Sequence, residues 1–331
     1  MRTKSIWYLV VLAIVLMACS DDDPEPSGPE ETNPKVSSSS TYQVLLEENV
    51  VYGYGLHHES LNSAAFSMEP LALDVYYPDN DIEKRPVIMF IHGGAFIGGS
   101  KSQGHIISLA NYFASRGWVF VSIDYRLRDD IGSVPQEWVD FSQLTPIEDV
   151  SKFLAIYPAH RDAKAAMRWL VSNASTFNID TNYISVGGGS AGAVTAITLG
   201  ISHEEDYRDE LSIVQDPSLE TTHLSQTYQI KTILNFWGTK VGLDALSEIY
   251  NKQRFDEDNP PLFIAHGTLD DIVPFSHAED LKSIYENLKL PLAYYPLEGF
   301  GHSAWNATYN GQSLEELAFD FIVEQQNLIV E

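Results

Sequence analysis

The sequence is poor in cysteine and in basic residues. Cys19 is the only cysteine among 331 residues, so no disulfide can form within the chain. Lysine and arginine number 20 against 46 aspartates and glutamates, which gives a formal net charge of -26 at pH 7. A surface this acidic repels nucleic acids and anionic membranes, so we expect neither as a binding partner. The less specific interpretation of the acid excess is a well-solvated surface.

Metal-binding motifs and internal repeats are also missing from the sequence. There is neither an H-E-x-x-H segment nor a cluster of cysteines, and we therefore expect no metal site. No repeated segment is apparent either. What is present, 44% hydrophobic and 20% charged residues, is ordinary for a soluble globular protein.

The first residues have the features of an export signal. Arg2 and Lys4 place positive charge before an apolar run over 6–17, which is too short to span a bilayer comfortably. The run ends in L-M-A-C at 16–19, which resembles the lipobox of bacterial lipoproteins, where the cysteine thiol is diacylated and the chain is cleaved before it. We therefore expect residues 1–18 to be a lipoprotein signal peptide and Cys19 to carry lipid. The alternative is a plain secretory signal followed by a chance cysteine.

Residues 19–40 are expected to form a flexible acidic tether. Three aspartates follow Ser20, and the stretch after them is rich in Pro, Glu, Ser and Thr, with too little apolar surface to pack. An acidic run directly after the lipobox cysteine resembles the export signal of surface lipoproteins in certain Gram-negative bacteria. The resemblance implies an outer-membrane lipoprotein, exposed at the cell surface, that meets the membrane through its lipid anchor only. The sequence leaves open which face of the outer membrane it occupies.

From residue 41 to 331 the sequence alternates between strand and helix patterns. Short continuous apolar runs at 86–91 and 118–123 are typical of strands buried on both faces. The alternation predicts one α/β domain, with a mostly parallel sheet covered by helices on both faces. In such sheets ligands bind beyond the carboxyl ends of the strands. Further strands are expected at 42–52, 71–77, 183–186, 230–236, 262–265 and 292–295, and helices at 104–116, 162–172, 191–201, 276–288 and 313–326.

Residues 188–192 read G-G-S-A-G, a G-x-S-x-G sequence centred on Ser190. The segment follows a short apolar strand and opens a helix rich in Ala and Thr, which is the context that a nucleophile elbow requires. Small neighbours let nearby backbone pass the turn, and the helix N-terminus favours negative charge on a bound acyl group. The alternative is a glycine-rich phosphate-binding turn. Against it, neither a G-K-[ST] continuation nor G-x-G-x-x-G spacing is present.

Three more segments follow expected strands. Residues 92–96 read H-G-G-A-F, residues 266–274 read H-G-T-L-D-D-I-V-P, and residues 299–303 read G-F-G-H-S. His302 is the last histidine and follows both the serine and the aspartates. The chain therefore has the order serine, acid, histidine that the α/β-hydrolase triad follows.

Together with D-Y-R-L at 124–127, these segments resemble the H-G-G-x-F branch of α/β-hydrolase esterases and lipases. That branch includes hormone-sensitive-lipase-like esterases and bacterial feruloyl-esterase-type carboxylesterases. The resemblance covers the chain from about residue 71 to its end. It implies the α/β-hydrolase fold and acyl transfer without a cofactor, with Ser190 as nucleophile, His302 as general base and Asp270 as the acid of the triad. Asp271 competes for the last role, and motif position selects Asp270.

The same resemblance implies the parts that surround the triad. The backbone N–H groups of Gly94, Ala95 and Ala191 would stabilise the oxyanion. His92 and His266 would brace their loops rather than take part in the chemistry.

The substrate is the part that the sequence specifies least. Phe96, Trp237 and Trp305 are the candidate substrate-binding aromatics, together with Trp138 and Phe141 in an expected loop at 126–146, although each fits simple packing of the loops equally well. The segment 237–259 is too short for a large lid, which disfavours a long-chain lipase.

We expect a serine carboxylesterase, and the resembling family and the expected location suggest acetyl or feruloyl esters of polysaccharide as substrates. A peptidase of the same fold is one alternative, although it would usually carry an added propeller domain. A catalytically inactive, glycan-binding surface lipoprotein is the other. A fluorophosphonate probe separates active from inactive forms, because only an activated serine reacts with it.

Overall fold

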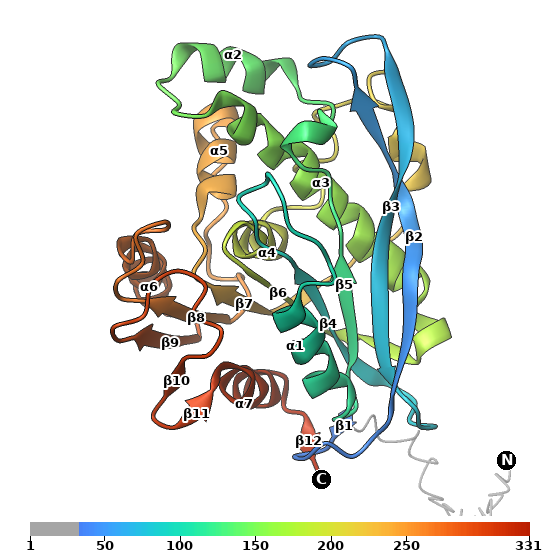
Figure 1. Ribbon diagram of the computed structural model, residues 1–331, viewed down its shortest axis with the longest axis vertical. Coiled ribbons are helices and arrows are strands. Elements are labelled where there is room, and N and C mark those ends of the chain that lie inside the picture. Colours follow the sequence, from blue (N-terminus) through green and yellow to red (C-terminus); the bar gives the residue numbers. More distant parts are fainter. Residues whose placement is uncertain (1–32) are drawn as a thin grey trace, which may run out of the picture. The chain divides into compact units, whose positions relative to one another are not determined.

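Eight strands form the main sheet of the computed structural model, which describes residues 33–331 (Figure 1). The pairs β2–β3 and β3–β5 are antiparallel, and all the other pairs in this sheet are parallel. The expected mostly parallel sheet is therefore confirmed. In spatial order the strands are β2 (Val44–His58), β3 (Phe66–Pro78), β5 (Val119–Ile123), β4 (Arg85–Ile91), β6 (Ile179–Gly189), β7 (Ile230–Phe236), β8 (Leu262–Gly267) and β9 (Leu292–Leu297).

Helices cover both faces of this sheet, and each face has its own hydrophobic core. On one face lie α1 (Gly104–Ala114) and α7 (Leu314–Gln326). On the other lie α3 (Val150–Ser172), α4 (Ala191–Ile201), α5 (Val241–Tyr250) and α6 (Ser276–Leu288), with α2 (Gln136–Leu144) packed against α3 and α5. The remaining elements are the 3-10 turns η1 (Arg128–Asp130), η2 (Ala174–Phe177) and η3 (Pro217–Thr221), and the two-residue strand pairs β1 (Lys35–Val36) with β12 (Ile329–Val330) and β10 (Thr308–Tyr309) with β11 (Gln312–Ser313).

The central strand β4 shows why a continuous apolar run forms such a sheet. Every residue of the strand is buried. Because side chains alternate between the two faces of a strand, Val87 and Met89 enter one core while Ile88 and Phe90 enter the other. Each large apolar side chain buried in this way contributes about 1.5–3 kcal/mol. A polar side chain at any of these positions would therefore have to be buried in one of the two apolar cores, which costs free energy.

The structure differs from expectation around α3 and before it. This helix begins at Val150 rather than at residue 162, and it contains Pro158, a residue that normally ends a helix. It continues because residues on both sides of the proline are buried against the sheet and α4, and because the Asp149 side chain caps its first turn by accepting the Lys152 N–H. The expected loop at 126–146 contains α2, whose Trp138 is fully buried and stacks on Phe153.

The N-terminal boundary of the folded part also differs from expectation. Residues 35–36 were expected in the tether, but they form β1, which pairs in parallel with β12, and Val36 is 2% exposed. Residues 19–40 are polar as a whole, so the single apolar residue Val36 did not indicate a strand. The expected signal peptide at 1–18, Cys19 and the tether as far as residue 32 lie outside the described residues. Between residues 33 and 331, no helix combines the length and the apolar character needed to cross a membrane.

Candidate active site

Ser190 stands in the sharp turn between β6 and α4, with φ 55° and ψ -122°. This backbone conformation is rare for a residue with a side chain and costs on the order of 1–3 kcal/mol. The Ser190 N–H donates to the carbonyl of Phe236 at 2.9 Å, which helps to hold the turn. A Cβ at Gly192 would lie 2.0 Å from the carbonyl oxygen of Ile91, so only glycine fits there. The turn thus has the geometry of a nucleophile elbow at the carboxyl end of a parallel strand.

The structure brings Ser190, His302 and Asp270 together from three different loops. Nε2 of His302 lies 2.9 Å from the Ser190 Oγ, and its Nδ1 lies 2.8 Å from Oδ2 of Asp270. A carboxylate only accepts hydrogen bonds, so Nδ1 carries the proton. Nε2 is then free to accept the serine hydroxyl proton, which is the arrangement that activates a serine.

The Asp270 side chain is fully buried. Its Oδ1 accepts the backbone N–H groups of Ile272 at 3.0 Å and Val273 at 2.8 Å. Burial acts to raise the pKa of this carboxyl, but the hydrogen bonds from His302 and the two backbone groups outweigh burial and hold the pKa below its ordinary value. Asp271 is exposed and has no hydrogen bond or ion pair to another described residue. Of the two adjacent aspartates, only Asp270 contacts His302.

Two of the three expected oxyanion donors, Gly94 and Ala95, lie in the loop after β4, and the third, Ala191, begins α4; all three line hollows that Ser190 also lines. Gly94, Ala95 and Phe96 all have positive φ, and a Cβ at Gly94 would lie 1.9 Å from the carbonyl oxygen of Gly98. The N–H groups of Gly94, Ala95 and Ala191 donate to no acceptor among residues 33–331. Unpaired donors next to a nucleophile are available to stabilise a developing oxyanion.

His92 braces this loop and does not reach Ser190. Its ring is buried and stacks on Tyr125 at 4.3 Å between centroids. Nδ1 donates to the carbonyl of Gly93 at 2.8 Å, and the Tyr125 hydroxyl donates to the carbonyl of His92 at 2.9 Å. Burial lowers the pKa of His92, so the ring is neutral.

Ser190 lines two separate chambers. The larger, of about 560 Å³, lies between the oxyanion loop, α3 and the start of α5, and it includes Phe96, Phe153, Ile156, Val194, Val241 and His277. The smaller, of about 310 Å³, is lined by Gln103, His105, Trp237, His302, Ser303 and Trp305. We call them the α3 chamber and the tryptophan chamber.

The three aromatics singled out in the sequence divide between these chambers. Phe96 lines the α3 chamber, and Trp237 and Trp305 line the tryptophan chamber. Phe96 and Trp237 are almost fully buried, so each also packs its loop. His105 matched no motif, yet it stacks on Trp305 at 4.3 Å, and burial lowers its pKa to about 4. No periodicity or motif in the sequence indicates that His105 belongs to the site.

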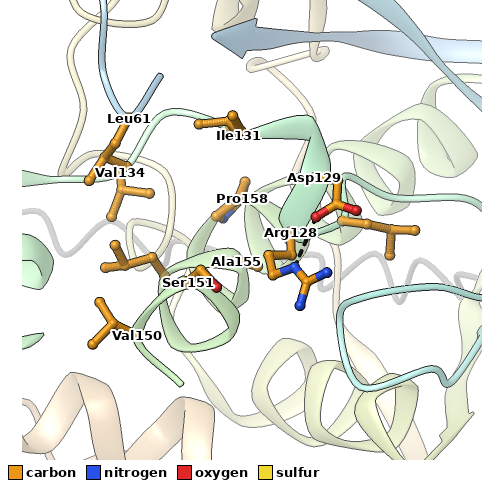
Figure 2. Close-up of a pocket in the computed structure, with 12 residues that line it drawn as sticks. Leu61, Arg128, Asp129, Ile131, Val134, Val150, Ser151, Ala155 and Pro158 are labelled. Atoms are coloured by element: carbon orange, nitrogen blue, oxygen red, sulfur yellow. Dashed lines mark hydrogen bonds and ion pairs between the residues drawn. The ribbon is translucent and has the colours of Figure 1, made fainter. Parts of the chain in front are cut away.

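A third hollow of about 560 Å³ lies between η1 and α3, and no residue of the triad lines it (Figure 2). Leu61, Ile131, Val134 and Pro158 make most of its wall apolar. Its one serine, Ser151, donates to the Asp149 carboxylate at 2.8 Å, and no histidine lines the hollow. This hollow therefore lacks a base to activate a nucleophile. In the described part of the chain, no three His, Cys, Asp or Glu side chains are grouped as a metal site would require.

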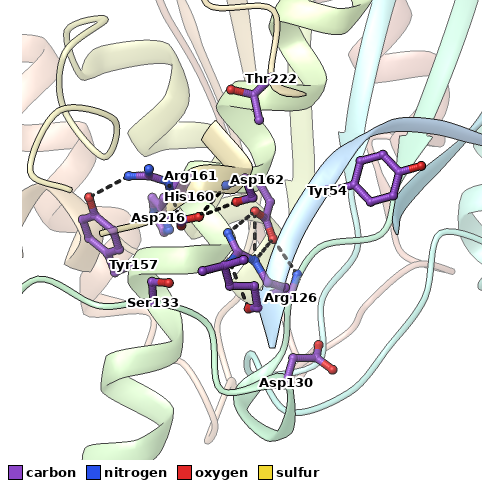
Figure 3. A network of polar contacts seen from close by, with 12 residues as sticks. Tyr54, Arg126, Asp130, Ser133, Tyr157, His160, Arg161, Asp162, Asp216 and Thr222 are labelled. Atoms are coloured by element: carbon purple, nitrogen blue, oxygen red, sulfur yellow. Dashed lines mark hydrogen bonds and ion pairs between the residues drawn. The ribbon is translucent and has the colours of Figure 1, made fainter. Parts of the chain in front are cut away.

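Arg126 and Asp162 form a buried ion pair within a network of polar contacts (Figure 3). Arg126 and Asp162 are each 2% exposed, and the guanidinium donates to the carboxylate from Nη2 at 2.6 Å and from Nε at 2.9 Å. The pair connects the segment after β5 to α3. Two residues further on, the Arg128 N–H donates to the carbonyl of Phe96 at 2.8 Å. The oxyanion loop is thereby tied to a rigid network.

Comparison with known proteins identifies a family and relatives of the chain. Residues 73–143 and 150–254, together more than half of the chain, match the family model BD-FAE. The esterase LipC of Mycobacterium tuberculosis is 27% identical over 254 residues, which cover 70% of this chain and 56% of LipC. Endo-1,4-beta-xylanase B of Butyrivibrio fibrisolvens is 24% identical over 231 residues, which cover 66% of this chain and 32% of the xylanase. The chain thus spans about half or less of the length of these curated relatives.

Among solved structures, a thermophilic esterase of the Planctomycetes species Thermogutta terrifontis with bound butyrate superimposes with a TM-score of 0.56. The two chains are 22% identical, and the match covers 77% of this chain and 89% of that esterase. At this level of identity the likeness establishes the shared fold.

Proposed function

The chain belongs to the BD-FAE family and has the α/β-hydrolase fold, and from this premise we propose that the protein is a serine carboxylesterase. The observation that carries the proposal is the position of the His302 ring, which joins the Ser190 hydroxyl to the buried Asp270 carboxylate. Unpaired backbone N–H groups lie beside the same serine. A nucleophile, a base and charge-stabilising donors meet at one point, as acyl transfer requires. The relative LipC, which is named an esterase, supports the same activity.

The reaction follows from these positions. His302 takes the Ser190 proton at Nε2 while Oγ attacks the ester carbonyl carbon, and the resulting oxyanion is held by the three N–H groups of the oxyanion loop and α4. His302 then gives its proton to the alcohol oxygen, which leaves as the carbonyl re-forms on the acyl-enzyme. Water enters, loses a proton to His302 and attacks the acyl carbon. The acid departs when the proton returns to Ser190.

The two chambers take different halves of the ester. His302 must protonate the leaving alcohol, and it lines the tryptophan chamber but not the α3 chamber. The alcohol therefore belongs in the tryptophan chamber. The acyl group extends the other way, into the α3 chamber, where Ala95 and Ala191 border the carbonyl oxygen.

We propose polysaccharide esters as the natural substrates, with a feruloyl group favoured over acetyl. The α3 chamber of about 560 Å³ has Phe96, Phe153 and Ile156 in its wall, which suits a planar aromatic acyl group better than a two-carbon one. The tryptophan chamber offers Gln103 and neutral His105 to hydroxyl groups of a sugar. A relative named as a xylanase further supports a polysaccharide, since that protein is named for acting on one.

We also propose that the protein is an outer-membrane lipoprotein exposed at the cell surface, anchored through Cys19. The support is the L-M-A-C segment at 16–19 and the acidic run that follows it. The signal peptide over 1–18 belongs to the same proposal.

A fluorophosphonate probe and an ester panel test the proposed activity. Purified protein should label at Ser190 and should hydrolyse feruloyl and acetyl esters of oligosaccharides but not peptide bonds. Absence of labelling would favour the inactive glycan-binding alternative. Labelling combined with cleavage of peptides alone would favour the peptidase.

A further inference from the structure

His266, at the carboxyl end of β8, contacts the same carboxylate as His302. Its Nε2 lies 3.1 Å from Oδ2 of Asp270 and 2.9 Å from the carbonyl oxygen of Val273, and the ring is fully buried. Both neighbours are acceptors without a proton, so Nε2 must be the protonated nitrogen and share its hydrogen between them. The tautomer of this histidine is therefore fixed by its surroundings.

Oδ2 of Asp270 thus lies against two imidazoles. His302 donates to it at 2.8 Å and Nε2 of His266 lies 3.1 Å from it, while Oδ1 accepts two backbone N–H groups. The ionisable groups that face this carboxylate are His302, from the loop after β9, and His266, from β8; Asp271 on the same loop is exposed. Burial lowers the pKa of His266, which keeps the ring neutral. Its Nδ1 has no partner among residues 33–331.

We propose that His266 is a positioning residue that acts as a second hydrogen-bond donor to the triad carboxylate, fixing its orientation and weakening its hold on the proton of His302. The inference rests on the proposed function, since it concerns the triad of that reaction. Each further donor to a carboxylate spreads its negative charge and reduces what remains to stabilise the imidazolium of His302.

Removing the donor should therefore move the acid limb of the pH profile. In His266→Leu, more negative charge remains on Oδ2 and the imidazolium of His302 is better stabilised. The acid limb of kcat/KM should shift to higher pH by about half a unit or more, the effect of one modest hydrogen bond. His266→Gln should restore the original profile, because the Gln amide nitrogen takes the place of Nε2 and still donates to Asp270.

His266→Asn is the second informative variant, and His160→Leu is the control. The Asn amide nitrogen takes the place of Nδ1, too far back to reach Asp270, so its profile should shift as that of His266→Leu does. His160 is also a buried histidine with an unpartnered ring nitrogen, but it does not contact the carboxylate. Its loss should lower the melting temperature and leave the acid limb in place.

The pH profiles should be measured on an activated ester, with active enzyme counted by fluorophosphonate titration. A common shift in the Leu and Asn variants, with rescue by Gln, supports the inference. Unchanged midpoints in both variants, with only the stability loss of the control, would overturn it. Labelling of the unaltered protein tests the proposed function separately, so the two failures can be told apart.

Discussion

Ser190 is the nucleophile of the proposed reaction, because its hydroxyl lies within hydrogen-bond distance of His302. Ser190→Ala removes the nucleophile but leaves the oxyanion donors and the chambers. We expect kcat to fall on the order of 10⁶-fold, with a residual rate from binding and the oxyanion hole. Steady-state kinetics on an activated ester measure the loss. Fluorophosphonate labelling that persists in this variant would place the nucleophile elsewhere.

Asp270 and Asp271 are neighbours in sequence with different surroundings. Asp270→Asn keeps the shape but favours the wrong tautomer of His302, and the loss in a triad is roughly 10⁴ in kcat. Asp271 is exposed and acts on the site only through screened, longer-range charge, so Asp271→Asn should cost less than about tenfold. The comparison of kcat in the two variants decides between them. A larger loss at Asp271 would mean that the acid was assigned one residue too early.

At the residue scale, motif position led to residues that the fold brings into contact. Ser190, Asp270 and His302 each follow a strand, and strand ends of a parallel sheet meet at one edge. Two other chamber residues could not be found in this way. His105 on α1 and Phe153 on α3 line the chambers only because of how those helices pack, which no local pattern records.

At the scale of elements, α3 is held to the loops by charge as well as by apolar packing. Arg126→Leu would leave the Asp162 carboxylate buried without its partner, and removing one member of a buried pair costs about 3–5 kcal/mol. The free energy of unfolding, from urea titration, should fall by that amount. Arg128→Leu is the matched control, because its partner Asp129 is exposed and such solvent-screened surface pairs contribute little to stability. Equal losses in the two variants would show that burial of the first pair is unimportant.

The walls of the α3 chamber should determine which acyl groups are accepted. Val241 lies at the start of α5, is only partly buried and lines this chamber, so Val241→Trp fills space without overpacking the core. We expect kcat/KM to fall more than about tenfold for feruloyl esters and to change little for acetyl esters of the same alcohol, since a hydrophobic pocket discriminates by about 1–3 kcal/mol. Gln103→Leu, in the tryptophan chamber, should change the preference for the alcohol instead. An effect of Val241→Trp on alcohol preference alone would reverse the assignment of the chambers.

Helices and strands with a clear apolar pattern between two turns were predicted with the correct bounds. Helices α4 and α6 and strand β7 have the bounds that their apolar spacing indicated, because each is punctuated by turns and packs along one face or both. The first half of α3 was not predicted; it contains Pro158, which is unfavourable inside a helix, and tertiary packing overrides that local preference. Helices α2 and α5 were missed because both lie in segments read as connections.

At the scale of the whole molecule, the candidate site lies at the carboxyl ends of the parallel strands and β1 lies near their amino ends. Ser190 follows the carboxyl end of β6. The chain around β1 instead bonds to the end of α1, where the Ser37 N–H donates to the carbonyl of Arg116 at 2.8 Å, just before β5 begins. β1 therefore lies near the amino ends of the parallel strands, paired with β12 (Figure 1).

Cys19, the proposed site of lipid attachment, can be tested by a single substitution. Cys19→Ser removes the only thiol that can be acylated, so the protein should move from the detergent phase to the aqueous phase in a partition assay. Its kcat/KM on a soluble ester should be unchanged, because the triad and the residues of both chambers lie between residues 93 and 305. Ser20→Ala is the matched control and should stay in the detergent phase. Retention of Cys19→Ser in the detergent phase would show that something other than this cysteine holds the protein to the membrane.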